Sequence, residues 1–368
     1  MSVEYCVELF DSGATWGPNT KLAEVWDARN LGWSRYDRLA GRAFFTVGQD
    51  SPYLALLDKL KTHARITRVA TSGNTEVFNG LIVDPDSTGD DVVVSAIDYL
   101  GLLGVSRCGY KTMYPKALIG GGIVSPEWTL AKNATGSRVG FIATGTIEDP
   151  VGTDGTTKIR TNTTFGLMDQ TRLRLFYDLS EMARANTVNH VTYEVTRSGT
   201  FTFNFWKNRG SASAIPLVLN GTVSDYQRLQ GWGAYRNDLA TLGTTTGGGS
   251  TEIISKDTAA IASRGLWQDA GSIPTIMGIV GKTTEADQQK AATDRMLQRA
   301  KQQNDALALV LVPGAIEPFA GWDICDTMWV EIVNGLDQIS TTWRVLGVRT
   351  IYDERGETLN LIVMPVVS

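Results

Sequence analysis

Cysteine and histidine are scarce in this sequence, and their scarcity excludes several kinds of site. The three cysteines, Cys6, Cys108 and Cys325, lie far apart and form no CxxC pair. Neither a disulfide framework nor a zinc site is therefore expected. Two histidines, His63 and His190, leave little material for a catalytic triad or a histidine metal site. We expect three buried thiols, no metal and no cofactor.

Long apolar runs and excess positive charge are lacking as well. No run approaches the ~18–20 residues that a helix needs to span a bilayer. The opening MSVEYCVELFDSG has no basic stretch followed by an apolar one, so we expect no signal peptide, no membrane anchor and synthesis in a cytoplasm. The net charge is -5, whereas proteins that grip DNA usually carry a basic surface. Tight DNA binding is not expected.

The composition is that of a folded chain, with 42% hydrophobic and 20% charged residues among 368. That length favours two or three domains. The patterns predict a mainly β (α+β) fold, because short alternating segments and turn residues far outnumber helical repeats. No long alternation of strand and helix is present, so a parallel α/β sheet is not expected.

The first hundred residues predict strands with one helix. Val3, Tyr5, Val7 and Leu9 alternate with polar residues, which is typical of a half-buried strand. Ser51 and Pro52 are favourable helix-start residues. The predicted elements that follow are the apolar stripe Leu54, Leu57 and Leu60, the strands His63–Ala70, Glu76–Val83 and Asp91–Ile97, and the turns Thr71–Thr75 and Asp84–Asp90.

The middle of the chain is less regular. Three glycines, Gly120–Gly122, should break any element, so residues 105–165 predict irregular loops with short strands. Thr171–Asn186 predicts an amphipathic helix. A hairpin follows it, with Val191, Tyr193 and Val195 on one face of its first strand, Phe201, Phe203 and Phe205 on one face of its second, and a turn at Ser198 and Gly199.

The last third predicts a linker, a helix and an antiparallel meander. Thr244–Ser250 (TTTGGGS) is typical of a flexible linker. Thr284–Gln303 predicts a helix. The predicted strands are Leu307–Val312, Asp326–Val333, Ile339–Tyr352 and Glu357–Val367. The resulting division is 1–105 (β-barrel domain with one helix), 106–165 (irregular insertion), 166–243 (helix-plus-hairpin middle domain), 244–305 (linker and helix) and 306–368 (second β-barrel domain).

Two distant segments share a spacing of turn residues. In each, one apolar strand precedes the turn and another follows it, so the segments are either two ordinary hairpins or two copies of one β-barrel subdomain. The matched positions are Gly80, Asp86, Gly89 and Asp90 in the first segment and Gly347, Asp353, Gly356 and Glu357 in the second.

Motifs for chemistry are weak. Ile276–Thr283 (IMGIVGKT) has the Gly-Lys of a phosphate-binding loop, but Ile276 stands where that loop requires glycine. An acidic group in the first segment predicts a turn rather than a calcium site, because its spacing is not that of an EF-hand. Other acidic groups could be offered as glycosidase carboxylates, but solvated faces explain them better. The group weighed as a calcium site is Asp84, Asp86, Asp90 and Asp91. The groups weighed as glycosidase carboxylates are Asp323, Asp326 and Glu331, and Asp353, Glu354 and Glu357.

Ten tryptophans are scattered along the chain. Scattered tryptophans mostly fill cores, and we expect two or three at subunit interfaces. We predict no catalytic, cofactor-binding or metal-binding residue.

Three stretches resemble one protein family, the tail hub proteins of long-tailed phages, which are in turn similar to the baseplate hub of contractile-tailed phages. The likeness covers about two-thirds of the chain as a pattern of elements. Residues 105–165 and the TTTGGGS loop fall outside it. The three stretches are Leu173–Phe205, Tyr235–Gly243 (YRNDLATLG) and Ile261 onward, the last with the helix Ala286–Gln303, Trp322–Val330 (WDICDTMWV) and WRVLGVRTIYDERGETLNLIVMP.

The resemblance implies a structural role at the tail tip of a virion, assembled in the host cytoplasm. Hubs of this family carry two tube-like β-barrels per chain, so a homotrimer presents six and continues a hexameric tube. The implied partners are a distal tail or adaptor protein, the tape measure protein and a central fibre or tip proteins. DNA would pass through the lumen without specific binding, repelled by acidic side chains.

Two other functions remain open from the sequence. A host-receptor or carbohydrate-binding β module agrees with the tryptophans and the β pattern. A wall-degrading enzyme would need a catalytic acidic residue that no motif indicates. Saturable glycan binding would favour the first, and release of wall fragments would favour the second.

Overall fold

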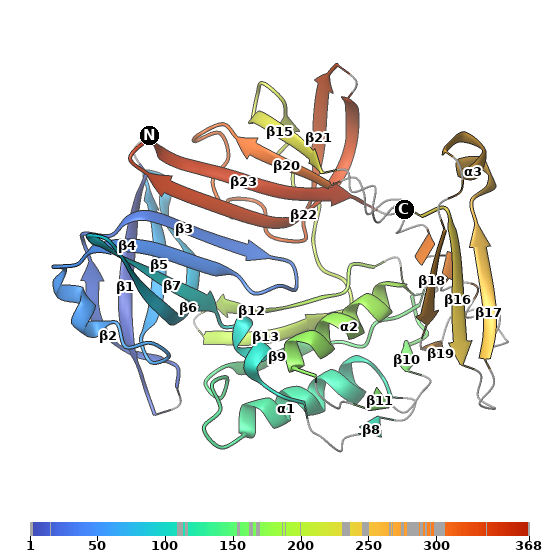
Figure 1. Cartoon of the computed structure of the whole chain (residues 1–368), viewed down its shortest axis with the longest axis horizontal. Helices are drawn as coiled ribbons and strands as arrows, with labels where there is room; N and C mark the ends of the chain where they lie inside the picture. The colour runs from blue at the N-terminus through green and yellow to red at the C-terminus, as the bar shows by residue number, and fades with distance from the viewer. Residues whose placement is uncertain are drawn as a thin grey trace.

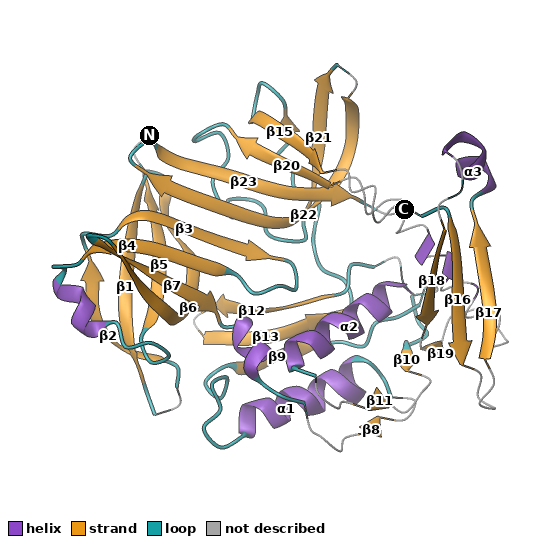
Figure 2. Ribbon diagram, viewed as in Figure 1, coloured by secondary structure: helices purple, strands orange, loops and turns teal. Residues whose placement is uncertain are grey.

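The protein is built mainly from β-strands, with short helices beside them (Figures 1 and 2), so the predicted mainly-β class is confirmed. None of the described helices is long and apolar enough to cross a membrane. The computed structural model describes residues 3–366 except positions 15, 109–112, 115–116, 153–154, 162–164, 167–169, 186, 188, 199, 230–235, 245–249, 265, 267, 274–275, 278–286, 288–289, 291–292, 295, 298–305 and 336.

One large, almost entirely antiparallel sheet dominates the molecule. Eleven of its thirteen strands form the path β15-β20-β23-β22-β3-β4-β7-β6-β5-β1-β2. Off this path, β21 pairs with β22 and β14 pairs with β21. The strands are β1 Glu4–Ser12, β2 Pro18–Val25, β3 Arg29–Tyr36, β4 Arg42–Gly48, β5 His63–Ala70, β6 Gly73–Thr88, β7 Asp91–Asp98, β14 Leu217–Val218, β15 Val223–Leu229, β20 Ala306–Leu311, β21 Thr327–Asn334, β22 Asp337–Asp353 and β23 Gly356–Pro365.

Smaller elements surround this sheet. The short strands are β8 Met113–Tyr114, β9 Ala143–Ile147, β10 Arg160–Thr161, β11 Phe165–Gly166, β12 Thr192–Ser198, β13 Thr200–Trp206, β16 Asp238–Thr244, β17 Ser250–Lys256, β18 Gln268–Ile273 and β19 Ile276–Met277. The helical segments are α1 Ser125–Asn133, α2 Arg172–Ala185, α3 Thr258–Arg264, the 3-10 turns η1 Pro52–Leu56 and η2 Gly101–Val105, and the π-turn η3 Gly120–Val124.

The large sheet contains the same five-stranded unit twice. Unit A is β3, β4, β5, β6 and β7, which pair in the order β3-β4-β7-β6-β5. Unit B is β15, β20, β21, β22 and β23, which pair in the order β15-β20-β23-β22-β21. Strands that correspond in chain order also correspond in position, and every pairing within both units is antiparallel. The two hairpins that share a turn spacing therefore belong to equivalent units.

Local irregularities are duplicated along with the strands. The long strand of each unit has a bulge opposite the strand that follows it, between Ile82 and Asp84 in β6 and between Val345 and Gly347 in β22. Just before the bulge, each long strand bonds the loop that leads into its neighbour. The Leu60 amide donates to the Ile82 carbonyl over 2.8 Å, as Cys325 does to Val345 over 2.8 Å.

The same loops share an uncommon backbone conformation. Leu60 has φ 64° and Cys325 has φ 77°, in the left-handed region that side chains rarely adopt. Aligned on the bulges, Gly347 corresponds to Asp84 rather than to Gly80. The glycine match in the sequence therefore found the right hairpins in a shifted register.

The units join edge to edge inside one chain. β3 of unit A pairs with β22 of unit B from Tyr36↔Gly347 to Leu31↔Tyr352. The described strands consequently form one open path rather than two closed barrels, because β3 pairs with the other unit instead of closing on its own. One hydrophobic core lies under both units and includes Phe45, Ile66 and Val348.

A second core belongs to the helix–hairpin module, made of α1, α2 and the hairpin β12–β13 (Figure 1). Leu175, Phe176, Leu179 and Ala183 recur along α2 and are fully buried, as the amphipathic pattern predicts. The hairpin is present as expected, with one residue between its strands. β9 adds to it as a parallel strand.

Two predicted elements differ from the structure. The helix expected after Ser51 is a single 3-10 turn, which ends at Leu57 with a non-helical ψ of 66°. Leu60, expected in the apolar stripe, has positive φ and lies 45% exposed. The turn expected over Asp84–Asp90 is shorter, because β6 runs on to Thr88 and only two residues separate it from β7.

The loops expected over 105–165 contain a helix. Gly120 starts a π-turn that leads directly into α1. A Cβ at this glycine would lie 2.1 Å from the Glu148 carbonyl oxygen, so glycine is required for close approach and does not break the element. The predicted helix over Thr284–Gln303 is helical at its described residues, and the predicted linker Thr244–Ser250 lies mostly outside the described residues.

Candidate functional site: the polar junction of three modules

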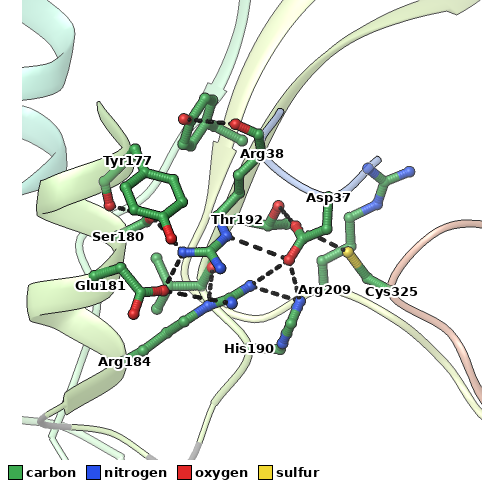
Figure 3. A network of polar contacts seen from close by, with 12 residues as sticks. Asp37, Arg38, Tyr177, Ser180, Glu181, Arg184, His190, Thr192, Arg209 and Cys325 are labelled. Carbon is green, nitrogen blue, oxygen red and sulfur yellow. Dashed lines mark hydrogen bonds and ion pairs between the residues drawn. The ribbon is translucent and has the colours of Figure 1, made fainter. Parts of the chain in front are cut away.

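A network of buried polar side chains lies where unit A, unit B and the helix–hairpin module meet (Figure 3). At its centre is Asp37, directly after β3. Asp37 Oδ2 accepts from Arg184 Nη2 of α2 over 2.8 Å and lies 3.1 Å from His190 Nε2. Its other oxygen accepts from the hydroxyl of Thr192 on β12 and, over 3.4 Å, from Cys325 Sγ. One carboxylate therefore links three modules.

Arg38 extends the network along α2. Its φ is 62°, a conformation that costs an arginine strain unless its surroundings hold it. Its Nη1 donates to Ser180 Oγ over 3.0 Å and to the carboxylate of Glu181. Its guanidinium lies 4.9 Å from the centre of the Tyr177 ring. These contacts fix the turn that follows β3 against the helix.

The ionisation states follow from burial and from the arginines. Burial opposes charge on Asp37, but the Arg184 guanidinium and the contact with His190 hold the pKa of Asp37 well below its ordinary value. Burial, with Arg184 beside it, lowers the pKa of His190 to about 3. Burial raises the pKa of the Cys325 thiol well above its ordinary value. The centre is thus a carboxylate between guanidinium groups, next to a neutral imidazole and a neutral thiol.

Asp37, His190 and Cys325 are also the one group of described residues whose ligand atoms are close enough to hold a metal ion, all within 4.8 Å of one another. The fit to a metal is poor. Arg184 Nη2 lies 2.6 Å from His190 Nε2 and 2.8 Å from Asp37 Oδ2, so a guanidinium occupies the position between the ligands. Its positive charge would repel a cation. The arrangement is a clamp, not a metal centre.

A second ion-pair cluster supports the same junction. Arg209 contacts Glu194 of β12 and, over 2.9 Å, Asp323 before β21. Arg35 of β3 lies 3.8 Å from Glu194 and 3.7 Å from Asp323. Burial raises the pKa of Glu194 despite these cations. The hairpin is therefore tied to both units by charge pairs as well as by packing.

A third pair joins the two units across the sheet. Arg68 of β5 donates to Glu357 of β23 over 2.9 Å through both Nε and Nη2. The Tyr5 hydroxyl donates to the same carboxylate. Burial and the nearby Glu357 raise the pKa of Tyr5. Glu357, one of the acidic residues considered from the sequence, thus has a structural partner.

The other acidic residues considered from the sequence are dispersed. Asp323 pairs with arginines as described, and Asp326 accepts the Ser211 amide over 2.7 Å. Asp91 pairs with Arg29. Asp84 and Asp86 lie on strand β6, and Glu331 is exposed on β21. The phosphate-loop-like segment lies outside the described residues after Met277.

The tryptophans divide as expected between cores and surface. Trp33 and Trp128 are fully buried. Trp26 is 78% exposed and Trp329 is 44% exposed, which makes these two the candidates for the predicted subunit interfaces. Trp232 and Trp267 lie outside the described residues.

An aromatic cleft lies where the β1–β2 hairpin, strands β5 and β6 of unit A and the helix–hairpin module meet. Its volume is about 570 Å³, and its lining includes Phe10, Tyr99, Phe141 and Phe201. Tyr99 stacks edge-on against Phe141 and Phe201, at ring-centre distances of 5.0 and 4.6 Å. His63 contacts Tyr99 over 3.1 Å at the floor of this cleft.

Sequence reasoning missed the clamp at Asp37. Its members come from positions 37, 184, 190 and 325, and nothing in their local patterns connects them. The sequence offered one signal. His190 and Arg184 flank the apolar face of the predicted helix and hairpin, and a polar residue buried there needs a partner.

No protein-family profile matches this sequence, and no curated protein sequence matches it. The fold is nevertheless that of phage tail proteins. The chain aligns over 98% of its length with 98% of the 43 kDa tail protein of prophage MuSo2 from Shewanella oneidensis, at 15% identity and a TM-score of 0.61. It aligns over 98% of its length with 96% of a tail protein from Neisseria meningitidis MC58, at 14% identity and a TM-score of 0.59.

A third solved structure extends this likeness. The chain aligns over 97% of its length with 94% of the prophage tail protein gp18 from Listeria monocytogenes EGD-e, at 9% identity and a TM-score of 0.55. The resemblance predicted from the sequence is confirmed at the level of the fold. The alignments cover 97–98% of the chain and so extend over most of residues 105–165, which the sequence resemblance does not reach.

Proposed function

We propose that this chain is the structural hub of a phage tail tip, in which three copies form a ring that continues the tail tube. The duplication of units A and B carries the proposal. A chain with two equivalent units in one sheet can supply six equivalent units from three copies, and six is the number that a hexameric tube requires. The fold shared with phage tail proteins supports the same role.

The remaining features of the hub belong to the proposal as well. A distal tail or adaptor protein and the tape measure protein would lie above the ring, and the central fibre or tip proteins below it. We keep the five-part domain division with one change: β15, within 166–243, is a strand of unit B, and β14 pairs with β21 of the same unit. The net charge of -5 supports passage of DNA without specific binding.

An enzymatic role is not proposed. Asp323, Asp326 and Glu357 are held in ion pairs or backbone contacts. A glycosidase needs two carboxyls facing each other across a sugar cleft at a defined separation. Of the acidic residues considered for this role, Asp323, Asp326 and Glu357 have structural partners, and Glu331 is exposed on β21.

Negative-stain electron microscopy of the purified chain, classified without imposed symmetry, tests the hub. We expect threefold particles with six lobes around a pore wide enough for duplex DNA. Particles without a pore, or monomers at every concentration in solution and also when the distal tail protein is added, would contradict it.

Carbohydrate binding is a second candidate, favoured by the aromatic cleft lined by Tyr99, Phe141 and Phe201. Aromatic faces stack on sugar rings. Titration with host wall glycans, followed by tryptophan and tyrosine fluorescence, tests it. Saturable binding that Phe201→Ala abolishes would support this function, and an unchanged signal would exclude it for the glycans used.

A further inference from the structure

Several strand edges of the large sheet have no described strand beside them, among them the outer edge of β15 and one edge of the second half of β6. β15 ends the pairing path, so its edge away from β20 is unpaired among the described strands. β6 pairs with β5 only up to Leu81, and its last residues, Val83–Thr88, have a strand partner on the β7 side alone. Unpaired edges offer rows of backbone donors and acceptors to another chain.

The chain itself contains a template for joining these two edges. β15 of unit B is the counterpart of β3 of unit A. The second half of β6 in unit A is the counterpart of the second half of β22 in unit B. Inside the chain, β3 of unit A pairs antiparallel with the second half of β22. Among the described strands, the corresponding junction from unit B to unit A is not formed within the chain.

We propose that β15 of one copy pairs antiparallel with Val83–Thr88 of β6 in a second copy, which reproduces between chains the junction that β3 and β22 form within one chain. The proposal rests on the trimeric hub and adds to it the surface by which the copies join. The two edges differ, so the contact is head-to-tail, and repeated contacts of this kind close into a ring when the rotation permits.

The duplicated bulges set the register of this seam. When the bulges of β6 and β22 are aligned, Thr88 corresponds to Ile351. When this alignment is carried through the strand pairing of each unit, Gln227 corresponds to Gly32. Gly32 and Ile351 are opposite each other in the internal junction. Gln227 is therefore expected opposite Thr88, and by the same alignment Leu229 opposite Asp86. Leu229 is 39% exposed in the single chain and would be covered in the ring.

The β6 edge also carries features that discourage indiscriminate pairing. Pro85 has no amide hydrogen to donate, and the exposed carboxylates of Asp84 and Asp86 flank it. Proline and charge on an edge strand suppress aggregation. A matched partner in one register can tolerate them, because the remaining backbone groups and Ser87 and Thr88 stay available.

A cysteine pair tests the seam in the full chain. In the double variant Gln227→Cys, Thr88→Cys, mild oxidation should produce covalent dimers and trimers on non-reducing gels, which reductant collapses to monomers. The matched control is Gln227→Cys, Ser87→Cys, which moves one cysteine to the opposite face of β6. Each single variant controls for the native cysteines.

The outcomes separate the seam from the hub. Cross-linking by the Thr88 pair and not by the Ser87 pair supports the seam. Trimers seen by native mass spectrometry without cross-linking by the Thr88 pair would overturn the seam and leave the hub intact. Equal cross-linking by both pairs would overturn the register. Monomers without cross-links up to millimolar concentration would overturn the seam, because strand pairing needs only this chain.

Discussion

At the scale of single residues, the molecule depends on buried charges that are paired across modules. Asp37 is 8% exposed and receives donors from α2, β12 and unit B. A buried pair contributes little compared with apolar packing, but removing one partner leaves the other charge uncompensated. The clamp therefore specifies how the modules are oriented more than it adds stability.

Replacing Asp37 tests this account. Asp37→Asn keeps the shape but leaves Arg184 and Arg38 without their carboxylate, and we expect the free energy of unfolding to fall by about 3–5 kcal/mol. Urea denaturation measures it. Asp58→Asn is the control, since Asp58 forms an exposed pair with Lys61 and should change stability by less than about 0.5 kcal/mol. Equal effects of the two variants would refute the clamp.

The two histidines predict a loss of stability in mild acid. Burial lowers the pKa of His63 to about 4 and that of His190 to about 3, below the value of about 6.5 in an unfolded chain. As pH falls below 6.5, the unfolded state binds protons that the folded state does not. Stability should therefore fall by up to about 1.4 kcal/mol per pH unit for each histidine.

Asp98 limits the pH range in which the two histidines lower stability. Burial raises the pKa of Asp98 to about 6, so below pH 6 the folded state takes up a proton there and offsets one histidine. Thermal unfolding between pH 7.5 and 5 measures the net slope. His63→Gln should make the slope shallower between pH 6.5 and 6. A stability that rises as pH falls from 7 to 6 would contradict the assignment of neutral histidines.

At the scale of elements, alternation and turn residues predicted the strands well. His63–Ala70 is a strand with the predicted bounds, and the final meander is present with boundaries shifted by one or two residues. Errors arose where tertiary contacts override local pattern. At Gly120, where the π-turn begins, the backbone passes too close to Glu148 for a side chain to fit, and no local pattern reveals this contact.

Gly80 gives a prediction at this scale. A Cβ at Gly80 would lie 2.2 Å from the carbonyl oxygen of Ile97 in the neighbouring strand. Gly80→Ala should therefore push β6 and β7 apart and cost about 1–3 kcal/mol, read from the midpoint of urea unfolding. Gly121→Ala is the matched control, because its nearest neighbour would be 3.7 Å away. No difference between the variants would show that the hairpin absorbs the methyl group.

At the scale of the whole molecule, the main feature is the duplication of units A and B within one sheet. Units A and B share one core, and the helix–hairpin module is fastened beneath their junction by the clamp at Asp37. The paired units support the proposed hub of three copies, and the edges of β15 and β6 are where we propose that those copies join. Electron microscopy of the particles tests the first statement, and cross-linking through Thr88→Cys tests the second.

The sequence alone determined the mainly-β class, most strands, the amphipathic helix and the resemblance to tail hubs, because these depend on the spacing of apolar and turn residues along short stretches. It also indicated the duplicated hairpins, although in a shifted register. Only the tertiary structure decided the open joining of the units through β3 and β22, the aromatic cleft and the clamp at Asp37. These depend on residues hundreds of positions apart, such as Asp37 and Cys325, whose proximity is set by sheet topology and burial and leaves no periodic trace in the chain.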